Sequence, residues 1–198
     1  MSDKVLMTVR GEPVFITPSG EVYFDAGASI DADGSPHAYA PKGSGLRGLD
    51  DLANAGSPGN WYGLACGWNG QPIVQGNSDP APGFYVSPTA YRRKHHSPVS
   101  PMAYLDSETV PFIVVPGPLR KLVRPVVLGC RAIVSYNGKQ VECVVGDIGP
   151  ATHLGEMSIA CAKAVGINPD ARRGGVAGGV RYTIFPGETA LGLDLCPV

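Results

Sequence analysis

The chain has 198 residues, 43% of them hydrophobic, and its 16 basic and 17 acidic side chains give a net charge of −1. This apolar content is enough to build one sizeable core, so a disordered chain is excluded and a single domain over residues 1–198 is expected. The longest run of basic residues is Arg92-Arg93-Lys94, which is too short to follow a phosphate backbone, and nucleic acid is therefore not an expected partner.

Export and membrane signals are not evident in the sequence. The first 15 residues contain no long apolar segment, and nowhere do about 18 uncharged apolar residues follow one another. We predict no signal peptide and no membrane helix, leave the cellular location open, and expect a monomer. The five cysteines show no CxxC spacing, which favours buried reduced thiols over a disulfide framework or a zinc site. They are Cys66, Cys130, Cys143, Cys161 and Cys196.

Short apolar segments rich in Val, Ile, Phe and Tyr, each bounded by Gly, Pro, Asn or Asp, predict strands along most of the chain. The 27 glycines and 19 prolines are scattered rather than repeated, as in a turn-rich β protein. Asn137-Gly138 separates two of these segments and predicts a tight hairpin. The segments are residues 13–18, 21–26, 71–76, 83–88, 110–116, 123–136, 139–146 and 180–187.

Two short helices are predicted, one over residues 48–55 and one over residues 156–165. In the second, Ile159, Ala160, Lys163 and Ala164 fall at helical spacings, and the segment stops before a glycine. Its small residues would allow close packing against a sheet.

Two carboxylates near the end of the apolar segment 141–145 allow two interpretations. In a structural interpretation, Asp147 caps a turn, and Glu156 begins a helix whose dipole favours a negative charge. In a functional interpretation, both side chains project into one groove as the pair that glycoside hydrolysis requires. Their spacing in the sequence does not decide between the two.

Aromatic and polar segments add candidate binding residues. Trp61 and Tyr62 lie among glycines, where their rings would either stack on a sugar or fill the core. Asp31 and Asp33 belong to a DxDG stretch that resembles part of a calcium loop, but the remaining ligands of that pattern are absent. No metal site and no cofactor are therefore predicted.

Several motifs, in order along residues 22–187, resemble the fungal-type chitosanases of glycoside hydrolase family 75 and their bacterial relatives. The resemblance implies an endo-acting, inverting enzyme that hydrolyses β-1,4 bonds between glucosamine units without a cofactor. The two essential carboxylates of that family lie in a GD…GE segment, which matches Gly146-Asp147 and Gly155-Glu156. The motifs are DADGSPHAYAP, GLDDLANAGSPGNWYG, PIVQGNSDPAPGFYVSPTAY, YLDSETVPFIVVPG, AIVSYNGKQVECVVGDIGPATHLGEMSIACAKAVGI and GGVRYTIFPG.

The GD-x-G-P turn followed by a helix is also similar to the active-site segment of double-psi β-barrels, as in some endoglucanases, expansins and lytic transglycosylases. We therefore expect a mainly β fold with a six-stranded barrel of the double-psi type, added loops and one or two short helices.

Roles for the two carboxylates follow from their expected surroundings. Asp147 emerges from an apolar strand, and because desolvation raises a carboxyl pKa, Asp147 is expected to be the general acid. Glu156 is expected at a helix start, where amide dipoles lower its pKa, and would be the base that orients water. Inversion would need carboxyl groups about 6.5–9.5 Å apart.

The expected partner is a polysaccharide of amino sugars, whose ammonium groups need anions. The acidic residues expected to supply them are Asp25, Asp31, Asp33 and Asp106, while Thr152 and Ser158 are expected to add hydroxyl contacts. Two alternatives stay open. One is a peptidoglycan-cleaving enzyme that uses Asp147 alone, and the other is an expansin-like module that binds carbohydrate without cleaving it.

Overall fold

The computed structural model describes residues 2–123 and 128–190. Its fold is mainly β, with two short α-helices, α1 (Gly117–Leu122) and α2 (Ile159–Val165), and two 3-10 helices, η1 (Leu52–Ala55) and η2 (Pro101–Ala103). The strands are β1 (Lys4–Val9), β2 (Glu12–Ile16), β3 (Val22–Asp31), β4 (Gly56–Ser57), β5 (Asn60–Trp61), β6 (Phe112–Pro116), β7 (Cys130–Tyr136), β8 (Lys139–Gly149), β9 (Glu156–Ser158) and β10 (Val176–Thr189).

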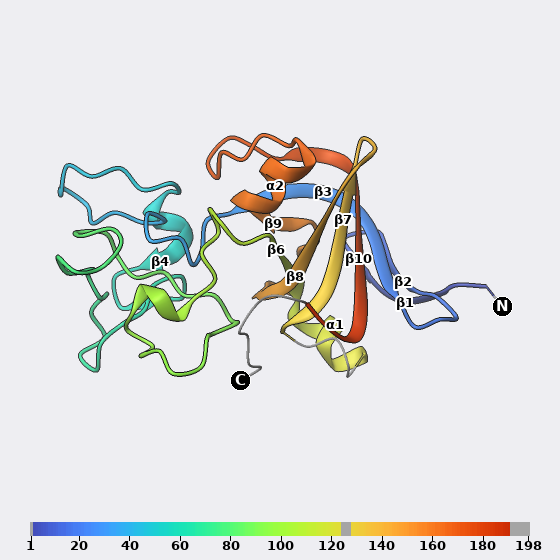
Figure 1. Cartoon of the computed structure of the whole chain (residues 1–198), viewed down its shortest axis with the longest axis horizontal. Coiled ribbons are helices and arrows are strands. Elements are labelled where there is room, and N and C mark those ends of the chain that lie inside the picture. The colour runs from blue at the N-terminus through green and yellow to red at the C-terminus, as the bar shows by residue number, and fades with distance from the viewer. Residues whose placement is uncertain (1, 124–127, 191–198) are drawn as a thin grey trace.

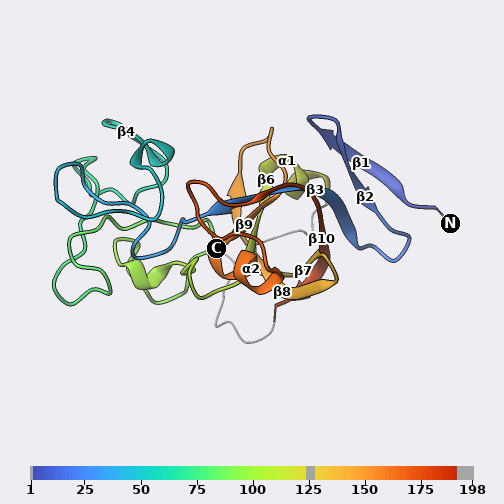
Figure 2. The ribbon, with the colours of Figure 1, turned by 90° about the horizontal axis from the view of Figure 1, so that it is seen from above.

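Six strands close into a barrel in the order β3-β10-β7-β8-β6-β9, because β9 pairs back onto β3. The pairs β3–β9 and β6–β8 are parallel, and the other four pairs around the barrel are antiparallel. The β1-β2 hairpin extends the sheet from β3 away from the barrel, and the loop-rich residues 32–111 lie on the opposite side (Figures 1 and 2). The mainly β fold, the closed six-stranded barrel and the two short helices confirm these parts of the expected architecture.

The barrel encloses an apolar core. Phe24 on β3 and Tyr182 on β10 are fully buried and stack with their ring centroids 4.8 Å apart. The Tyr182 hydroxyl donates a hydrogen bond to the backbone oxygen of Gly27 at 3.0 Å, so its polar atom is satisfied. Burying a side chain of this size contributes about 1.5–3 kcal/mol to the free energy of unfolding.

The predicted hairpin is confirmed. β7 and β8 pair from Arg131 to Tyr136, and the last pair, Tyr136 with Lys139, leaves a two-residue turn. Asn137 and Gly138 both have positive φ, 46° and 75°. This is what a type I′ turn requires, and Asn-Gly adopts it at low cost.

Most predicted strands are found, and the exceptions have physical reasons. Residues 71–76 and 83–88 form only isolated bridges, Val74 with Tyr85 and Pro72 with Cys66, because they lie in the loop-rich region away from a larger sheet. Strand β1 was not predicted, and only one of its six residues, Val9, is buried. Residues 124–127 of the predicted segment 123–136 lie outside the described residues.

The predicted helix over residues 156–165 is wrong in its first turn. Glu156–Ser158 form strand β9, which pairs with β3 on one side and β6 on the other and closes the barrel. α2 begins only after Ser158, whose hydroxyl accepts a hydrogen bond from Cys161 N. Tertiary pairing outweighs local helical preference here. The other predicted helix, over residues 48–55, is reduced to η1.

The thiols agree with the sequence-based expectation where they are described. Cys66, Cys143 and Cys161 are free, and Cys130, Cys143 and Cys161 are buried. Cys196 lies outside the described residues. In the part of the chain that the structure describes, none of the helices has the length and apolar character needed to cross a membrane.

Candidate active site

The central strand of the candidate site is β6, which lies between β8 and β9. Val114 on β6 pairs with Asp147 on β8 and also with Glu156 on β9. Residues paired across neighbouring strands project to the same face of a sheet. The two carboxylates therefore face one side of the barrel wall, with two strand spacings, about 9.5 Å, between their backbone positions.

Both carboxylates line a groove of about 940 Å³. The groove lies where the barrel meets the loop-rich region, since its walls come from β3, β6, β8 and β9 and from loops on both sides. The five acidic residues that line it are Asp31, Asp33, Asp50, Asp147 and Glu156.

A β-bulge brings Asp147 into register. Ile113 pairs with Val145 and Val114 pairs with Asp147, so Gly146 is the extra residue. A Cβ at Gly146 would lie 2.7 Å from the Cβ of Phe112, which excludes any larger residue without rearrangement. The glycine of the GD motif thus permits the close packing that precedes the carboxylate.

The Asp147 carboxyl is buried, with 9% of the residue exposed. Its Oδ1 accepts hydrogen bonds from Ala90 N at 2.8 Å and from Ile148 N at 2.7 Å. Burial raises the pKa of Asp147 to about 6, and these two N–H donors limit the rise because they stabilise the ionised form. Tyr91 N also donates to Gly146 O at 3.0 Å, which holds the donating segment against β8.

Glu156 is the first residue of β9. Burial raises its pKa to about 7, and the charges of Asp147 and then Asp50 add to the rise. The expectation that a helix start would lower the pKa of Glu156 is therefore wrong, because residues 156–158 are extended. The expected role of Glu156 as the general base rested on that lowered pKa, so this argument for the role no longer holds.

Asp31 and Asp33, at and just after the end of β3, lie in the same groove. Asp33 N donates to Asp31 Oδ1 at 2.7 Å, and the hydroxyls of Ser87 and Tyr39 donate to the Asp33 carboxyl. Burial and the Asp147 charge raise the pKa of Asp33 to about 7 despite these donors. The pKa of Asp31 is raised well above its ordinary value by burial and then by the charges of Asp33, Asp147 and Glu156.

Other residues predicted to bind substrate lie away from the groove. Asp25 forms a two-pronged ion pair with Arg181, at 2.9 and 2.7 Å. Asp106 accepts hydrogen bonds from Glu108 N and from the Thr109 hydroxyl, both at 3.0 Å, so it stabilises its own turn. Thr152 is exposed in the loop before β9 and does not line the groove.

Ser158 is fully buried and has a structural part in the fold. Its hydroxyl accepts from Phe112 N and Cys161 N and donates to Val110 O, at 2.9–3.1 Å. These bonds join β6, β9 and α2 behind the groove.

The two neighbouring aromatics have different surroundings. Tyr62 lines the groove and is 69% exposed, so its ring is available to a bound sugar. Trp61 is half-buried, packs against the main apolar core, and pairs with Gly56 in the small β4–β5 sheet. Of the two interpretations of these residues, the core interpretation describes Trp61 and the binding interpretation suits Tyr62.

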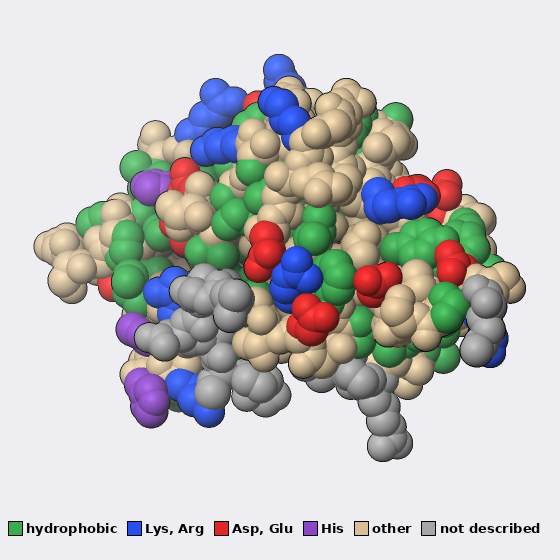
Figure 3. Space-filling model, turned by 45° about the vertical axis from the view of Figure 1, so that its right-hand side comes forward, with side chains coloured by type: hydrophobic (Ala, Val, Ile, Leu, Met, Phe, Trp, Pro, Cys, Tyr) green, Lys and Arg blue, Asp and Glu red, His purple; other side chains and the backbone are tan. Residues whose placement is uncertain are grey.

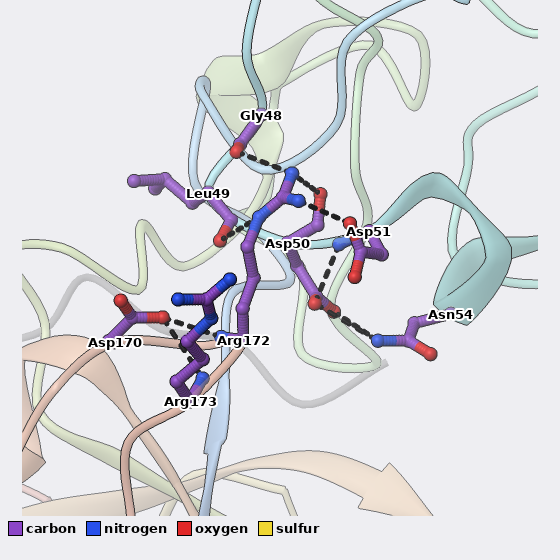
Figure 4. A network of polar contacts seen from close by, with 8 residues as sticks. All are labelled: Gly48, Leu49, Asp50, Asp51, Asn54, Asp170, Arg172 and Arg173. Atoms are coloured by element: carbon purple, nitrogen blue, oxygen red, sulfur yellow. Dashed lines mark hydrogen bonds and ion pairs between the residues drawn. The ribbon is translucent and has the colours of Figure 1, made fainter.

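Sequence analysis did not name Asp50, Asn54 or Arg172, although all three line the groove. Arg172 reaches from the loop after α2 to the segment 48–51, where it binds backbone oxygens and the Asp51 carboxylate (Figure 4). These residues are more than 110 positions apart in the sequence. No local motif signals such a contact, so only a fold reveals it.

Acidic side chains gather in the groove, where five of the described residues are Asp or Glu. On the face in Figure 3, acidic and basic side chains lie intermixed. Surface carboxylates on the barrel have basic partners, for example Glu142 and Glu188 around Arg131. In the groove, Arg172 is the only Lys or Arg among the described lining residues.

In the described ranges, no group of three or more His, Cys, Asp or Glu side chains is arranged to hold a metal ion. The arrangement supplies a buried carboxyl, Asp147, and a half-buried one, Glu156, both with pKa values near neutrality and facing one groove, which is suited to acid and base catalysis at a bond between them. No protein-family model matches this sequence, and no curated protein matches it either.

Proposed function

We propose that the protein is an endo-acting glycoside hydrolase that cleaves β-1,4 bonds in chitosan, using Asp147 and Glu156. The observation that carries this proposal is the pairing of both residues with Val114, which directs their two carboxyls into one groove. A volume of about 940 Å³ accommodates several sugar units.

The proposed reaction inverts the anomeric centre. One carboxylic acid protonates the glycosidic oxygen as its bond to the anomeric carbon breaks. The other carboxylate takes a proton from the water that attacks that carbon from the opposite face. Backbone positions about 9.5 Å apart are compatible with the carboxyl separation of about 6.5–9.5 Å that inverting enzymes use.

Electrostatics support Glu156 as the general acid and Asp147 as the base, the reverse of the roles expected from the sequence. Asp147 receives two backbone N–H bonds on Oδ1, which favour its ionised form. The pKa of Glu156 is raised further, to about 7, which favours a protonated side chain near neutral pH.

The charge of the groove supports a cationic substrate. Five acidic residues line it, and the guanidinium of the one arginine beside them is directed to backbone oxygens and Asp51. Ammonium groups of glucosamine units would supply the missing positive charge. A neutral glycan would leave these acidic side chains desolvated without a positively charged partner.

We also infer that the barrel is of the double-psi type. The closed six-stranded barrel contains two parallel strand pairs, β3–β9 and β6–β8, and its other neighbouring strands are antiparallel. This mixture of parallel and antiparallel pairs supports the finer description.

Reducing-end release from soluble chitosan and from purified peptidoglycan tests the proposed function, with the Asp147→Asn variant as control. We expect release from chitosan by the wild type and none by the variant. Products from peptidoglycan with anhydro ends would instead indicate a lytic transglycosylase. Binding to glycan without any bond cleavage would indicate an expansin-like module, and either result would overturn the proposal.

A further inference from the structure

Asp50 is a buried carboxylate that the proposed acid and base do not use. It lines the groove, and only 8% of the residue is exposed. The Asn54 amide nitrogen lies 3.0 Å from each of its carboxylate oxygens, and Asp51 N donates to Oδ1 at 2.7 Å. The backbone is also held, because Asp50 N donates to Ala38 O at 3.0 Å. Asp50 is therefore fixed in position before any ligand binds.

Arg172 contacts the segment that contains Asp50, but it forms no ion pair with the Asp50 carboxylate. Arg172 donates to the backbone oxygens of Leu49 at 3.3 Å and of Gly48 and Asp50 at 2.9 Å, and it forms an ion pair with Asp51. Figure 4 shows the guanidinium turned toward these oxygens, while the Asp50 carboxylate faces Asn54. Among the described residues, no Lys, Arg or His forms an ion pair with Asp50.

We propose that Asp50 binds the ammonium group of a glucosamine unit next to the scissile bond and so determines that the groove accepts a non-acetylated sugar there. This inference rests on the proposed function and adds the residue that selects the substrate. The site is a groove wall that presents a fixed, desolvated carboxylate without a cation. A primary ammonium supplies the positive charge that this carboxylate lacks, and it can donate hydrogen bonds to the remaining lone pairs of the carboxylate oxygens.

The position beside the scissile bond follows because Asp50 and Glu156 line the same groove. The Asp50 charge also contributes to the raised pKa of Glu156. An ammonium bound between the two would offset that charge in the substrate complex. N-acetylation removes the cation and adds bulk, so it would leave the Asp50 carboxylate buried without a positively charged partner.

The test compares Asp50→Asn with Asp51→Asn as a matched control. Both changes remove one negative charge from the same segment, but Asp51 pairs with Arg172 whereas Asp50 faces the groove. The kcat/KM values are measured on a fully deacetylated glucosamine hexamer and on hexamers that are acetylated at one defined unit. Thermal melting checks that each variant is folded.

We expect Asp50→Asn to lower kcat/KM on the deacetylated hexamer by about tenfold to a hundredfold, the size typical of losing a charge-assisted hydrogen bond. The ratio of kcat/KM on the deacetylated hexamer to kcat/KM on a singly acetylated hexamer should decrease by a similar factor. Asp51→Asn should change neither value more than about twofold, because Asp51 is exposed and Arg172 still donates to the backbone oxygens of Gly48, Leu49 and Asp50.

A wild-type measurement keeps the inference testable if Asp50→Asn does not fold. Partly acetylated chitosan is digested, and the units on each side of the cleaved bonds are identified. We expect only glucosamine at one of these positions. Acetylated units at both positions, or an unchanged amine preference in folded Asp50→Asn, would overturn the role of Asp50. Absence of any chitosan cleavage by the wild type would instead overturn the proposed function.

Discussion

Asp147 and Glu156 are register partners of the same residue, Val114, one from each neighbouring strand of β6. This arrangement makes their separation a property of the barrel rather than of the loop that joins them in sequence. Because strands in a sheet keep a constant spacing, the two backbone positions are held rigidly. A carboxylate pair that must leave room for sugar and water between its members benefits from such rigidity.

Removing either carboxyl should abolish turnover without unfolding the protein. Asp147→Asn and Glu156→Gln are nearly isosteric, and the proposed reaction needs one acid and one base. We expect each variant to lose on the order of 10²–10⁴-fold in kcat on chitosan. Steady-state rates and circular dichroism check this. Full activity in either folded variant would contradict the pairing.

Activity should depend on pH as a bell-shaped curve. The active form has one carboxyl protonated and the other ionised, and the pKa values of about 6 for Asp147 and about 7 for Glu156 bracket the pH at which this form is most populated. The apparent values belong to the interacting pair. We expect kcat/KM to peak between these values and to fall on both sides. A rate independent of pH from 4 to 8 would exclude this assignment.

Stability should fall as pH rises, because burial raises the pKa of Glu156 from 4.5 to about 7. Between these values the folded protein binds more protons than the unfolded chain, so its free energy of unfolding decreases with pH and levels off above about 7. Glu156→Gln removes this penalty, and we expect it to stabilise the protein by on the order of 1–3 kcal/mol at pH 8, after screening by water.

Urea denaturation at pH 4 and pH 8 checks this expectation. The stabilising effect of Glu156→Gln should be largest at pH 8 and close to zero at pH 4, where the wild-type carboxyl is protonated in the folded protein. An effect of the same size at both pH values would show that packing, not charge, is responsible.

Tyr62 and Trp61 should respond differently to truncation. Tyr62→Ala removes an exposed ring from the groove, and we expect weaker chitosan binding by about 0.5–1.5 kcal/mol with little change in Tm. Trp61→Ala removes a half-buried ring from the edge of the core, and we expect a lower Tm, with a loss of about 1–3 kcal/mol. Binding titrations and thermal melts on both variants separate these outcomes, and interchanged results would contradict the assignment.

Ser158→Ala should lower stability rather than substrate affinity. The change removes a buried hydroxyl with three hydrogen bonds and leaves Phe112 N and Cys161 N without their partner, at a cost of about 1–3 kcal/mol. Thr152→Ala, at an exposed position, serves as the control and should change stability by less than about 0.5 kcal/mol. An increased KM with unchanged Tm for Ser158→Ala would restore its expected role in binding.

Local patterns in the sequence were sufficient for much of the framework. Apolar segments bounded by turn residues predicted most strands of the barrel, and Asn137-Gly138 predicted the β7-β8 turn, because these signals act over a few neighbouring residues. Asp147 also stood out because it follows an apolar strand, and Glu156 was added through the resemblance to a GD…GE segment.

Only the tertiary structure decided how these residues meet. Residues 156–158 have a helical pattern, yet they form β9 because the open edges of β3 and β6 provide backbone hydrogen bonds on both sides. That pairing sets the distance between the two carboxyls and reverses the expected pKa shift of Glu156. Asp50 reaches the same groove through the contact of Arg172 with the segment 48–51. Long-range pairing and burial determine these features, and neither is encoded in the spacing of residues along the chain.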